Sequence, residues 1–205
     1  MLRVNLTDLD RSSDVVHTRR GEAVMLRVVV PDDAEALQAY VRGLGSRSRY
    51  NRFLGALSEL PKAVLDDFTH AGRDDRYSLI ATMHDDDAEP IVGEARYAFH
   101  PEDDSIEFGV SVQDRWQGHG IGPALLQNLE CRAAALGAHI IFGDTLRSND
   151  VMITLAKKSG YLLRQHPDDW RLVRFEKQLV KVASLPCANL RLVAAAKPLG
   201  EMQAR

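Results

Sequence analysis

The feature that most constrains the fold is a glycine-rich turn between a strand pattern and a helix pattern. The turn at 117–122 (QGHGIG) follows an apolar stretch at 105–112 and precedes a helical pattern that runs from 123 to 136. A short strand pattern at 139–143 comes next. A strand, a helix and a second strand in this order predict a crossover connection that leaves the two strands parallel in one sheet.

The other strand patterns favour antiparallel pairing. Segments 77–83, 91–99 and 105–112 are separated by acidic turns at 84–90 and 101–104, which is typical of a meander. Further strands are expected at 24–30, 160–163 and 172–175, and helices at 32–44, 61–68 and 150–159, the first with Asp32 as N-cap and Glu35 completing a capping box. We therefore predict an α/β fold with a mixed, mostly antiparallel central sheet flanked by helices.

Length and composition predict one globular domain. The 205 residues are 45% hydrophobic and 27% charged, which is not the composition of a disordered chain. We expect an N-terminal arm at 1–22, one folded domain at 23–178 and a C-terminal tail at 179–205. Gly93 within the strand 91–99 is expected to mark a β-bulge.

Charge and apolar patterning exclude several classes of partner. The net charge of −3 disfavours a polycation that coats nucleic acid. The start of the chain does not resemble a signal peptide, and no apolar run approaches the ~20 residues that span a bilayer. The two cysteines lie far apart without further ligands at metal-binding spacing. We therefore expect a cytoplasmic protein without a membrane partner and without a bound metal.

The glycine turn suits an anionic ligand. Glycines allow a close backbone approach, and the helix start adds unpaired N–H groups and the positive end of the helix dipole. A pyrophosphate would fit there. A nicotinamide-binding turn requires Gly-x-Gly-x-x-Gly, but Pro123 or Leu125 occupies the third glycine position, and the chain lacks a P-loop. A glycine turn without a ligand stays an alternative.

The surroundings of the turn resemble the GNAT superfamily of N-acetyltransferases. Gln117-x-x-Gly120-x-Gly122 is similar to the loop that binds the CoA pyrophosphate in this family. The strand IEFGVSV at 106–112 and the segment SNDVMITLAKKSGY at 148–161 resemble the motifs before and after it, and the start at 24–37 also resembles the family. Segment 46–53 (SRSRYNRF), with 106–122, looks like the GNAT domain of bacterial protein lysine acetyltransferases.

The resemblance implies acetyl-CoA as the acyl donor and an amine as the acceptor. It implies a donor site made of Val110, Ser111, Val112, Gln117, Gly118, His119, Gly120, Ile121, Gly122 and Asn149. Asn149 equally suits a helix cap. One departure concerns the general acid, because Ala156 stands where many members of the family have a Tyr. Either no side chain protonates the leaving thiolate, or a water or Ser148 does.

Glu107 is the candidate general base. Side chains alternate along a strand, so Glu107 shares a face with Gly109 and Ser111, whose small side chains leave room for an amine. A carboxylate in this place can accept the proton of an amine directly or through a water. The lysine acetyltransferases that the chain resembles use a glutamate at the matching position. The alternative is a solvated strand charge.

The predicted function is direct transfer of an acetyl group from acetyl-CoA to a primary amine, foremost a protein lysine. The alternatives are a small-molecule amine acceptor and a non-catalytic acyl-CoA sensor. The arginines of segment 46–53 are interpreted as a solvated face, with a substrate or phosphate contact as the alternative. A homodimer is left open.

Overall fold

A single eight-stranded sheet forms the centre of the molecule. The computed structural model describes residues 14–70, 76–83 and 89–179. The strands are β1 (Asp14–His17), β2 (Ala23–Val28), β3 (Arg76–Met83), β4 (Ile91–His100), β5 (Ser105–Val112), β6 (Ile140–Leu146), β7 (Leu162–Gln165) and β8 (Leu172–Gln178). Their order in the sheet is β1-β2-β3-β4-β5-β6-β8-β7.

The predicted mixed sheet is confirmed. Every neighbouring pair of strands is antiparallel except β5 and β6, which are the parallel pair expected on either side of the crossover helix. The β5–β6 ladder is short. It contains only the pairs Ser105–Ile140, Ile106–Ile141 and Glu107–Phe142, whereas β4 pairs with β5 along its whole length and β8 pairs with all of β6. β5 and β6 therefore diverge beyond Glu107.

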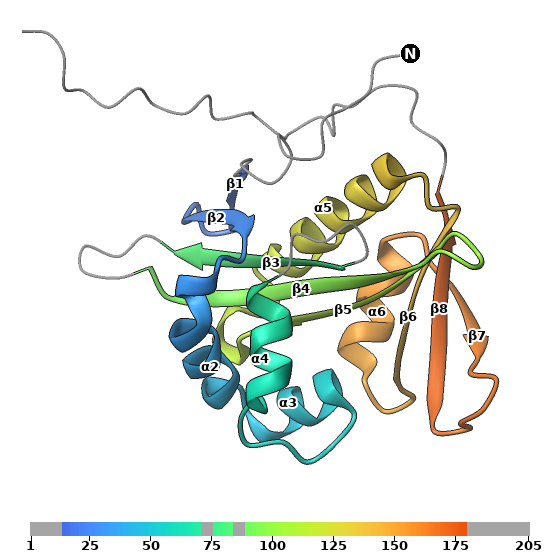
Figure 1. Cartoon of the computed structure of the whole chain (residues 1–205), viewed down its shortest axis with the longest axis horizontal. Helices are drawn as coiled ribbons and strands as arrows, with labels where there is room; N and C mark the ends of the chain where they lie inside the picture. The colour runs from blue at the N-terminus through green and yellow to red at the C-terminus, as the bar shows by residue number, and fades with distance from the viewer. Residues whose placement is uncertain (1–13, 71–75, 84–88, 180–205) are drawn as a thin grey trace, which may run out of the picture.

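Helices cover both faces of the sheet (Figure 1). They are α2 (Ala34–Gly43), α3 (Ser46–Phe53), α4 (Lys62–Thr69), α5 (Ile121–Leu136) and α6 (Asp150–Lys158), with short 3-10 turns η1 (Pro31–Asp33) and η2 (Asp114–Trp116). α2 and α4 pack on one face, where Ile80 contributes to the core. α5 and α6 pack on the other face, where Ile106 and Phe108 contribute. The side chains of Ile106 and Phe108 thus lie on one face of β5, as the alternation of side chains along a strand predicts.

The predicted strand and helix segments agree with the structure to within a few residues, but β1, which lies in the expected arm, and α3 were not predicted. α3 had no predicted secondary structure, because its eight residues contain three arginines and no buried side chain. The expected cap by Asp32 is wrong. Asp33 instead accepts a hydrogen bond from the N–H of Val30 at 2.8 Å and forms a bidentate ion pair with Arg27 at 2.7 Å. The bulge expected at Gly93 is confirmed next to it, with Val92 as the extra residue.

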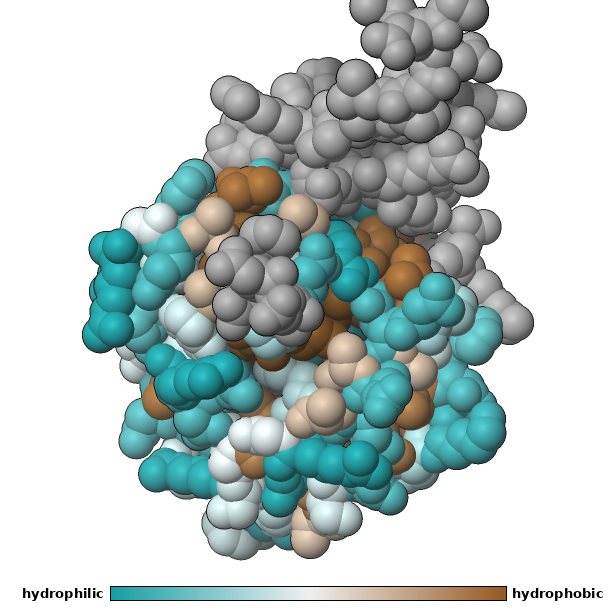
Figure 2. Space-filling view, turned by 90° about the vertical axis from the view of Figure 1, so that its left-hand side faces the viewer, coloured by the Kyte–Doolittle hydropathy of each residue, from teal (hydrophilic) through white to brown (hydrophobic). Residues whose placement is uncertain are grey.

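The ends of the expected domain lie partly outside the described residues. Within the expected arm at 1–22, β1 pairs with β2 as the edge strand of the sheet, and residues 1–13 lie outside the described part, as do 180–205 of the expected tail. The boundaries at 22 and 178 stay predictions. Figure 2 looks onto the β1, β2 and α2 end, where hydrophilic side chains surround smaller hydrophobic areas. In the described ranges, no helix has the length and hydrophobicity to cross a membrane.

Gly143 allows the close approach of β6 to β5 at the point where they diverge. A Cβ built there would meet the Phe175 ring at 2.7 Å and the Phe108 carbonyl oxygen at 2.9 Å. We expect Gly143→Ala to lower the free energy of unfolding by about 1–3 kcal/mol through overpacking. Urea denaturation measures this. Gly55→Ala is the control, because its nearest neighbour would be the Phe53 carbonyl oxygen at 3.8 Å. Equal stability of the two variants would contradict the close approach.

Asp33 makes the free energy of unfolding depend on pH in the acidic range. Burial opposes the charge of Asp33, but the hydrogen bonds from Arg27 and Val30 outweigh it and lower the pKa of this carboxyl. The pair stabilises the fold above the pKa of an unfolded Asp, about 3.9, and this contribution is lost as the pH falls through the lower folded value. We expect Asp33→Asn to cost about 1–3 kcal/mol at pH 7 and the difference from wild type to shrink below about pH 4.

The exposed neighbour Asp32 provides the matched control for this experiment. Chemical denaturation of the wild type, Asp33→Asn and Asp32→Asn between pH 3 and pH 7 gives the comparison. Asp32→Asn should leave the free energy of unfolding unchanged across this range. A pH-independent difference between wild type and Asp33→Asn would show that the charge of Asp33 is not the stabilising element.

Candidate active site

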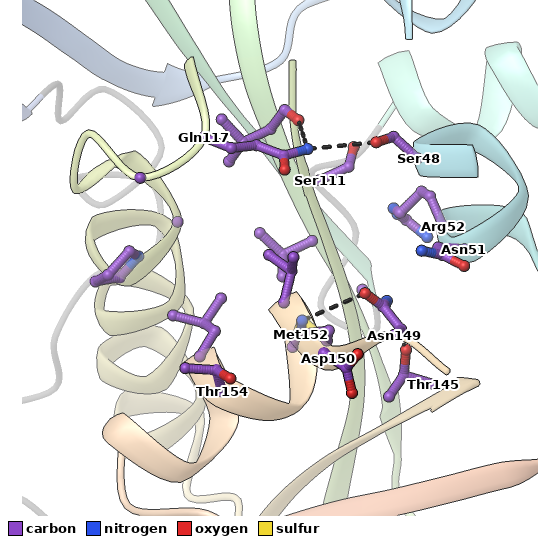
Figure 3. Close-up of a pocket in the computed structure, with 18 of the residues that line it drawn as sticks. Ser48, Asn51, Arg52, Ser111, Gln117, Thr145, Asn149, Asp150, Met152 and Thr154 are labelled. Carbon is purple, nitrogen blue, oxygen red and sulfur yellow. Dashed lines mark hydrogen bonds between the residues drawn. The ribbon is translucent and has the colours of Figure 1, made fainter. Parts of the chain in front are cut away.

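A cavity of about 620 Å³ lies where β5 and β6 diverge. Its walls come from β5, the loop before α5, one face of α6, the end of β6, and α3 on the far side of the sheet. Figure 3 shows that Ser48, Asn51 and Arg52 of α3 face Asn149 and Thr145 across this space. The cavity thus connects the two faces of the sheet.

The backbone of β5 points hydrogen-bond donors into the divergence. The N–H of Gln113 donates to the Val92 carbonyl oxygen at 2.9 Å, which extends the antiparallel ladder between β4 and β5 by one pair. In such a ladder, alternate residues direct their N–H and C=O groups toward the partner strand. Val112 and Val110 therefore direct theirs away from β4, toward the side on which β6 has separated. Both residues line the cavity.

The glycine loop presents further donors at the start of α5. Gly118 and Gly120 adopt left-handed φ angles of 78° and 98°, which side chains other than glycine rarely tolerate. Gly118, Gly120 and Gly122 all line the cavity. Within the described residues, the N–H groups of these three glycines donate no hydrogen bond to another residue. These donors and the helix dipole form a cradle for an anion.

Side chains tie the glycine loop to α3. The Gln117 amide donates to the Val112 carbonyl oxygen at 3.1 Å and to Ser48 Oγ at 3.3 Å (Figure 3). Asp114 accepts hydrogen bonds from Ser48 Oγ at 2.7 Å and from the Gly45 N–H at 2.8 Å. Burial of Asp114 opposes its charge, but these hydrogen bonds lower the pKa of the carboxyl. An ionised Asp114 therefore links the segment before the glycine loop to the start of α3.

Two of the predicted donor-site residues do not line the cavity. The His119 ring packs edge-on against the Trp116 ring, with the ring centroids 5.7 Å apart. Its Nδ1 lies 2.9 Å from the Gln117 carbonyl oxygen. The Ile121 side chain is buried in the core on the α5 face. The other eight predicted residues are brought together around the cavity: Val110, Ser111, Val112, Gln117, Gly118, Gly120, Gly122 and Asn149.

Asn149 links β6 to α6. Its Oδ1 accepts the Met152 N–H at 3.3 Å as the N-cap of α6, and its Nδ2 donates to Thr145 Oγ1 at 2.8 Å (Figure 3). The cap alternative of the sequence analysis is confirmed. Because Asn149 also lines the cavity, a contact to the donor remains compatible with this cap.

Glu107 lies at the rim rather than among the cavity-lining residues. Its side chain is 52% exposed, and its Oε2 lies 3.6 Å from His100 Nε2. Glu107 and Gly109 lie on the same face of β5, and Gly109 lines the cavity. Arg52 and Arg174 both interact with this carboxylate electrostatically. Glu107 is therefore open to solvent on the α3 side of the divergence.

A buried polar cluster that sequence analysis missed lies beside Gly109. The Arg52 guanidinium donates to both oxygens of Glu94, at 2.6 and 3.1 Å. Glu94 also accepts from Ser111 Oγ at 2.6 Å, and Ser111 Oγ lies 2.9 Å from the Tyr40 hydroxyl. A Cβ on Gly109 would meet Arg52 Nη1 at 2.5 Å, so the glycine allows Arg52 to reach the cavity. Although burial opposes the charge of Arg52, Glu94 outweighs it and raises the pKa of the guanidinium.

The arginines of α3 have three different roles, so a solvated face describes them poorly. Arg52 and Arg47 line the cavity, and Arg47 also donates to the Ser148 carbonyl oxygen at 3.1 Å, across the opening. Arg49 instead donates to the Arg42 and Leu44 carbonyl oxygens at the end of α2. The helical spacing of Arg47, Ser48, Asn51 and Arg52 was the available sequence signal, and it required recognising 46–53 as a helix.

Asp144 of β6 is a second carboxylate that sequence analysis missed. It lines the cavity, and Arg174 donates to its two oxygens at 2.9 and 2.8 Å. His166 Nδ1 accepts two backbone N–H groups, so the proton of the neutral ring is on Nε2, which lies 3.3 Å from Asp144. An isolated Asp in a strand pattern carries no sequence signal for such a site.

The structure offers no side-chain acid at the position expected from the family. Ala156 is completely buried in the core. Ser148 is not among the cavity-lining residues. In the described part of the chain, no group of three or more His, Cys, Asp or Glu side chains could hold a metal ion.

The geometry supports binding of an extended acyl-CoA. The glycine loop offers a cradle for an anion, and the unpaired edge of β5 offers backbone groups for an extended arm. The cavity also reaches α3, and Glu107 precedes the lining residue Phe108 on β5. This arrangement allows an acyl donor to enter from one face of the sheet and an acceptor from the other.

Comparisons with known proteins identify the family of the chain. Residues 47–161 match the family model described as the Acetyltransferase (GNAT) family. An acetyltransferase of Pseudomonas aeruginosa is 28% identical over 149 residues, which cover 73% of this chain and 80% of that protein.

Solved structures share the fold. The GNAT domain of S. lividans PAT has a TM-score of 0.75 and 27% identity, covering 82% of this chain and 97% of that domain. A cAMP-binding acyltransferase from Mycobacterium smegmatis has a TM-score of 0.57 and 21% identity, which shows the fold alone; the match covers 94% of this chain and 54% of that one. The family match spans more than half of the chain, with the glycine loop and the diverging strands inside it. The chain belongs to the GNAT family and is an acetyl-CoA-dependent N-acetyltransferase.

Proposed function

We propose that the chain transfers the acetyl group of acetyl-CoA directly to the side-chain amine of a protein lysine, with Glu107 as the general base. The observation that carries the proposal is the position of Glu107 on the open, α3 side of the divergence, opposite the face that holds the glycine loop. When bound, acetyl-CoA supplies an activated acyl carbon and a thiol leaving group. The residues of the chain bind it, orient it and accept the proton of the amine.

The donor is held by backbone groups. The N–H groups of Gly118, Gly120 and Gly122 bind the diphosphate, and those of Val110 and Val112 bind the arm or the carbonyl oxygen of the thioester. A preorganised N–H at that oxygen stabilises the negative charge that develops during attack. Ser111 contributes through its hydrogen bond to Glu94, which keeps this part of β5 in place.

Glu107 deprotonates the acceptor amine, which must be neutral to attack the acyl carbon. A free lysine amine has a pKa of about 10.4 and is protonated at neutral pH. Glu107 accepts a proton from the ammonium, directly or through one water, and the neutral amine then attacks the acyl carbon. The nitrogen loses its second proton to water or to the departing sulfur as the tetrahedral intermediate collapses. The carbon–sulfur bond then breaks and the thiolate leaves. No side-chain acid is assigned to the thiolate, because Ala156 replaces the expected Tyr and is buried.

The exposure of the proposed base supports a macromolecular acceptor. Glu107 is 52% exposed, so an amine at the end of a long, flexible side chain can reach it from solvent. A site for a small free amine would enclose its acceptor more completely. The resemblance of segments 46–53 and 106–122 to bacterial lysine acetyltransferases supports the same acceptor.

Replacement of the base tests the mechanism. We expect Glu107→Gln to lower kcat by about 100-fold to 10,000-fold, because the amide is nearly isosteric but does not accept the proton. The affinity for CoA, measured by calorimetry, should stay unchanged. Glu102→Gln is the matched control, since Glu102 also approaches His100, at 3.5 Å, but is 70% exposed and lies in the turn between β4 and β5. Equal activities of the two variants would exclude Glu107 as the base.

An acceptor screen tests the substrate class. We expect lysine-containing polypeptides to be acetylated faster than free small amines at equal amine concentration, measured by thiol release and by mass spectrometry of the product. Turnover only with small amines would favour a small-molecule acetyltransferase. Binding of acetyl-CoA without transfer to any amine would favour an acyl-CoA sensor.

A further inference from the structure

The turn between β1 and β2 is fastened to the glycine loop. The N–H of Arg19 donates to the His119 carbonyl oxygen at 3.1 Å. The turn itself is well defined, because the buried Thr18 accepts the N–H groups of Arg20 and Glu22 on its Oγ1 at 3.2 Å, and Gly21 adopts a φ of 91°. The backbone at Arg19 is therefore held beside the loop that forms the anion cradle.

Four cationic side chains line the cavity, and two of them are already engaged. Arg52 is paired with Glu94, and Arg47 donates to the Ser148 carbonyl oxygen; both come from α3. The other two are Arg19 and Lys158. Among the ion pairs between described residues, none involves Arg19 or Lys158. Arg52 and Arg47 are therefore held by a carboxylate and by a carbonyl oxygen, whereas Arg19 and Lys158 form no ion pair with a described residue.

Lys158 reaches the cavity from α6. It is the last residue of that helix, and it shares a helical face with Thr154 and Leu155, which also line the cavity. A Cβ on Gly122 would lie 3.4 Å from Leu155 Cδ2, so this face of α6 borders the start of α5. Arg19 and Lys158 are thus attached to two different elements that adjoin the glycine loop.

Backbone N–H groups alone do not balance the charge of the proposed donor. The nucleotide half of CoA carries a diphosphate and a 3′-phosphate, whereas the loop offers dipoles without net charge. We propose that Arg19 and Lys158 form a cationic clamp on these phosphates, so that the β1–β2 turn belongs to the donor site. The inference rests on acetyl-CoA as the donor, and it assigns a binding role to a segment expected to be an arm.

Binding measurements with matched neighbours test the clamp. Isothermal titration calorimetry compares CoA and 3′-dephospho-CoA on the wild type, Arg19→Ala and Lys158→Ala. The controls are Arg20→Ala and Lys157→Ala. Each removes one positive charge from the residue next to a clamp residue, and neither control residue lines the cavity. We expect each clamp variant to weaken CoA binding by about tenfold, as for one charge-assisted contact, and each control to stay within about twofold of wild type.

The two ligands distinguish the phosphates. A loss seen with CoA but not with 3′-dephospho-CoA assigns the contact to the 3′-phosphate, and an equal loss with both assigns it to the diphosphate. Arg19→Lys should retain most of the affinity, which separates loss of charge from a folding defect, and thermal melts confirm that each variant is folded. A loss with CoA alone and an equal loss with both ligands each support the clamp.

Several results would overturn the proposal, and they differ from failure of the proposed function. Arg19→Ala and Lys158→Ala that bind CoA as tightly as Arg20→Ala and Lys157→Ala would refute the clamp while leaving acetyl-CoA as the donor. A wild type that binds neither CoA nor 3′-dephospho-CoA would refute the donor and with it the clamp. Glu107→Gln should bind CoA normally in the same assay.

Discussion

The divergence of β5 and β6 after three residue pairs is the constraint on which the site depends. Each strand stays extended beyond that point, because β4 pairs with the other edge of β5 and β8 with the other edge of β6. The unpaired edge keeps its hydrogen-bonding groups, which buried backbone must satisfy with some partner. The sheet, in which strand pairing would otherwise be continuous, therefore has a gap between β5 and β6 that can bind a ligand. Gly143 makes the transition sharp, since it leaves room for the Phe108 carbonyl at the last point of contact.

Charges are divided between the two ends of this slot. On the α3 side, two arginines are paired with carboxylates: Arg52 with Glu94 and Arg174 with Asp144. That end presents carboxylates in fixed positions, which suits an incoming ammonium. On the other side, the cavity is lined by the glycine loop together with Arg19 and Lys158, which suits phosphates. In the proposed complex, this asymmetry orients the acyl-CoA with its thioester toward the end where Glu107 is open to solvent.

Much of the fold followed from local patterns in the sequence. The meander, the crossover helix and the cap at Asn149 each depend on residues close together in the chain, where periodicity, glycine and capping preferences act directly. Helix α3 was missed because it buries no side chain and shows no apolar periodicity. The Arg52–Glu94 pair was missed for a related reason, since its partners are 42 residues apart and meet only when α3 docks on the sheet.

The sequence by itself therefore determined the strand and helix order, the left-handed glycine turn and the face on which Glu107 lies, because each is set by backbone preferences within a few residues. Only the tertiary structure decided where β5 and β6 part, which arginines are neutralised by carboxylates, and that the β1–β2 turn brings Arg19 to the glycine loop. Those features arise from contacts between distant segments, whose partners are chosen by packing and desolvation of the whole domain and not by any local pattern.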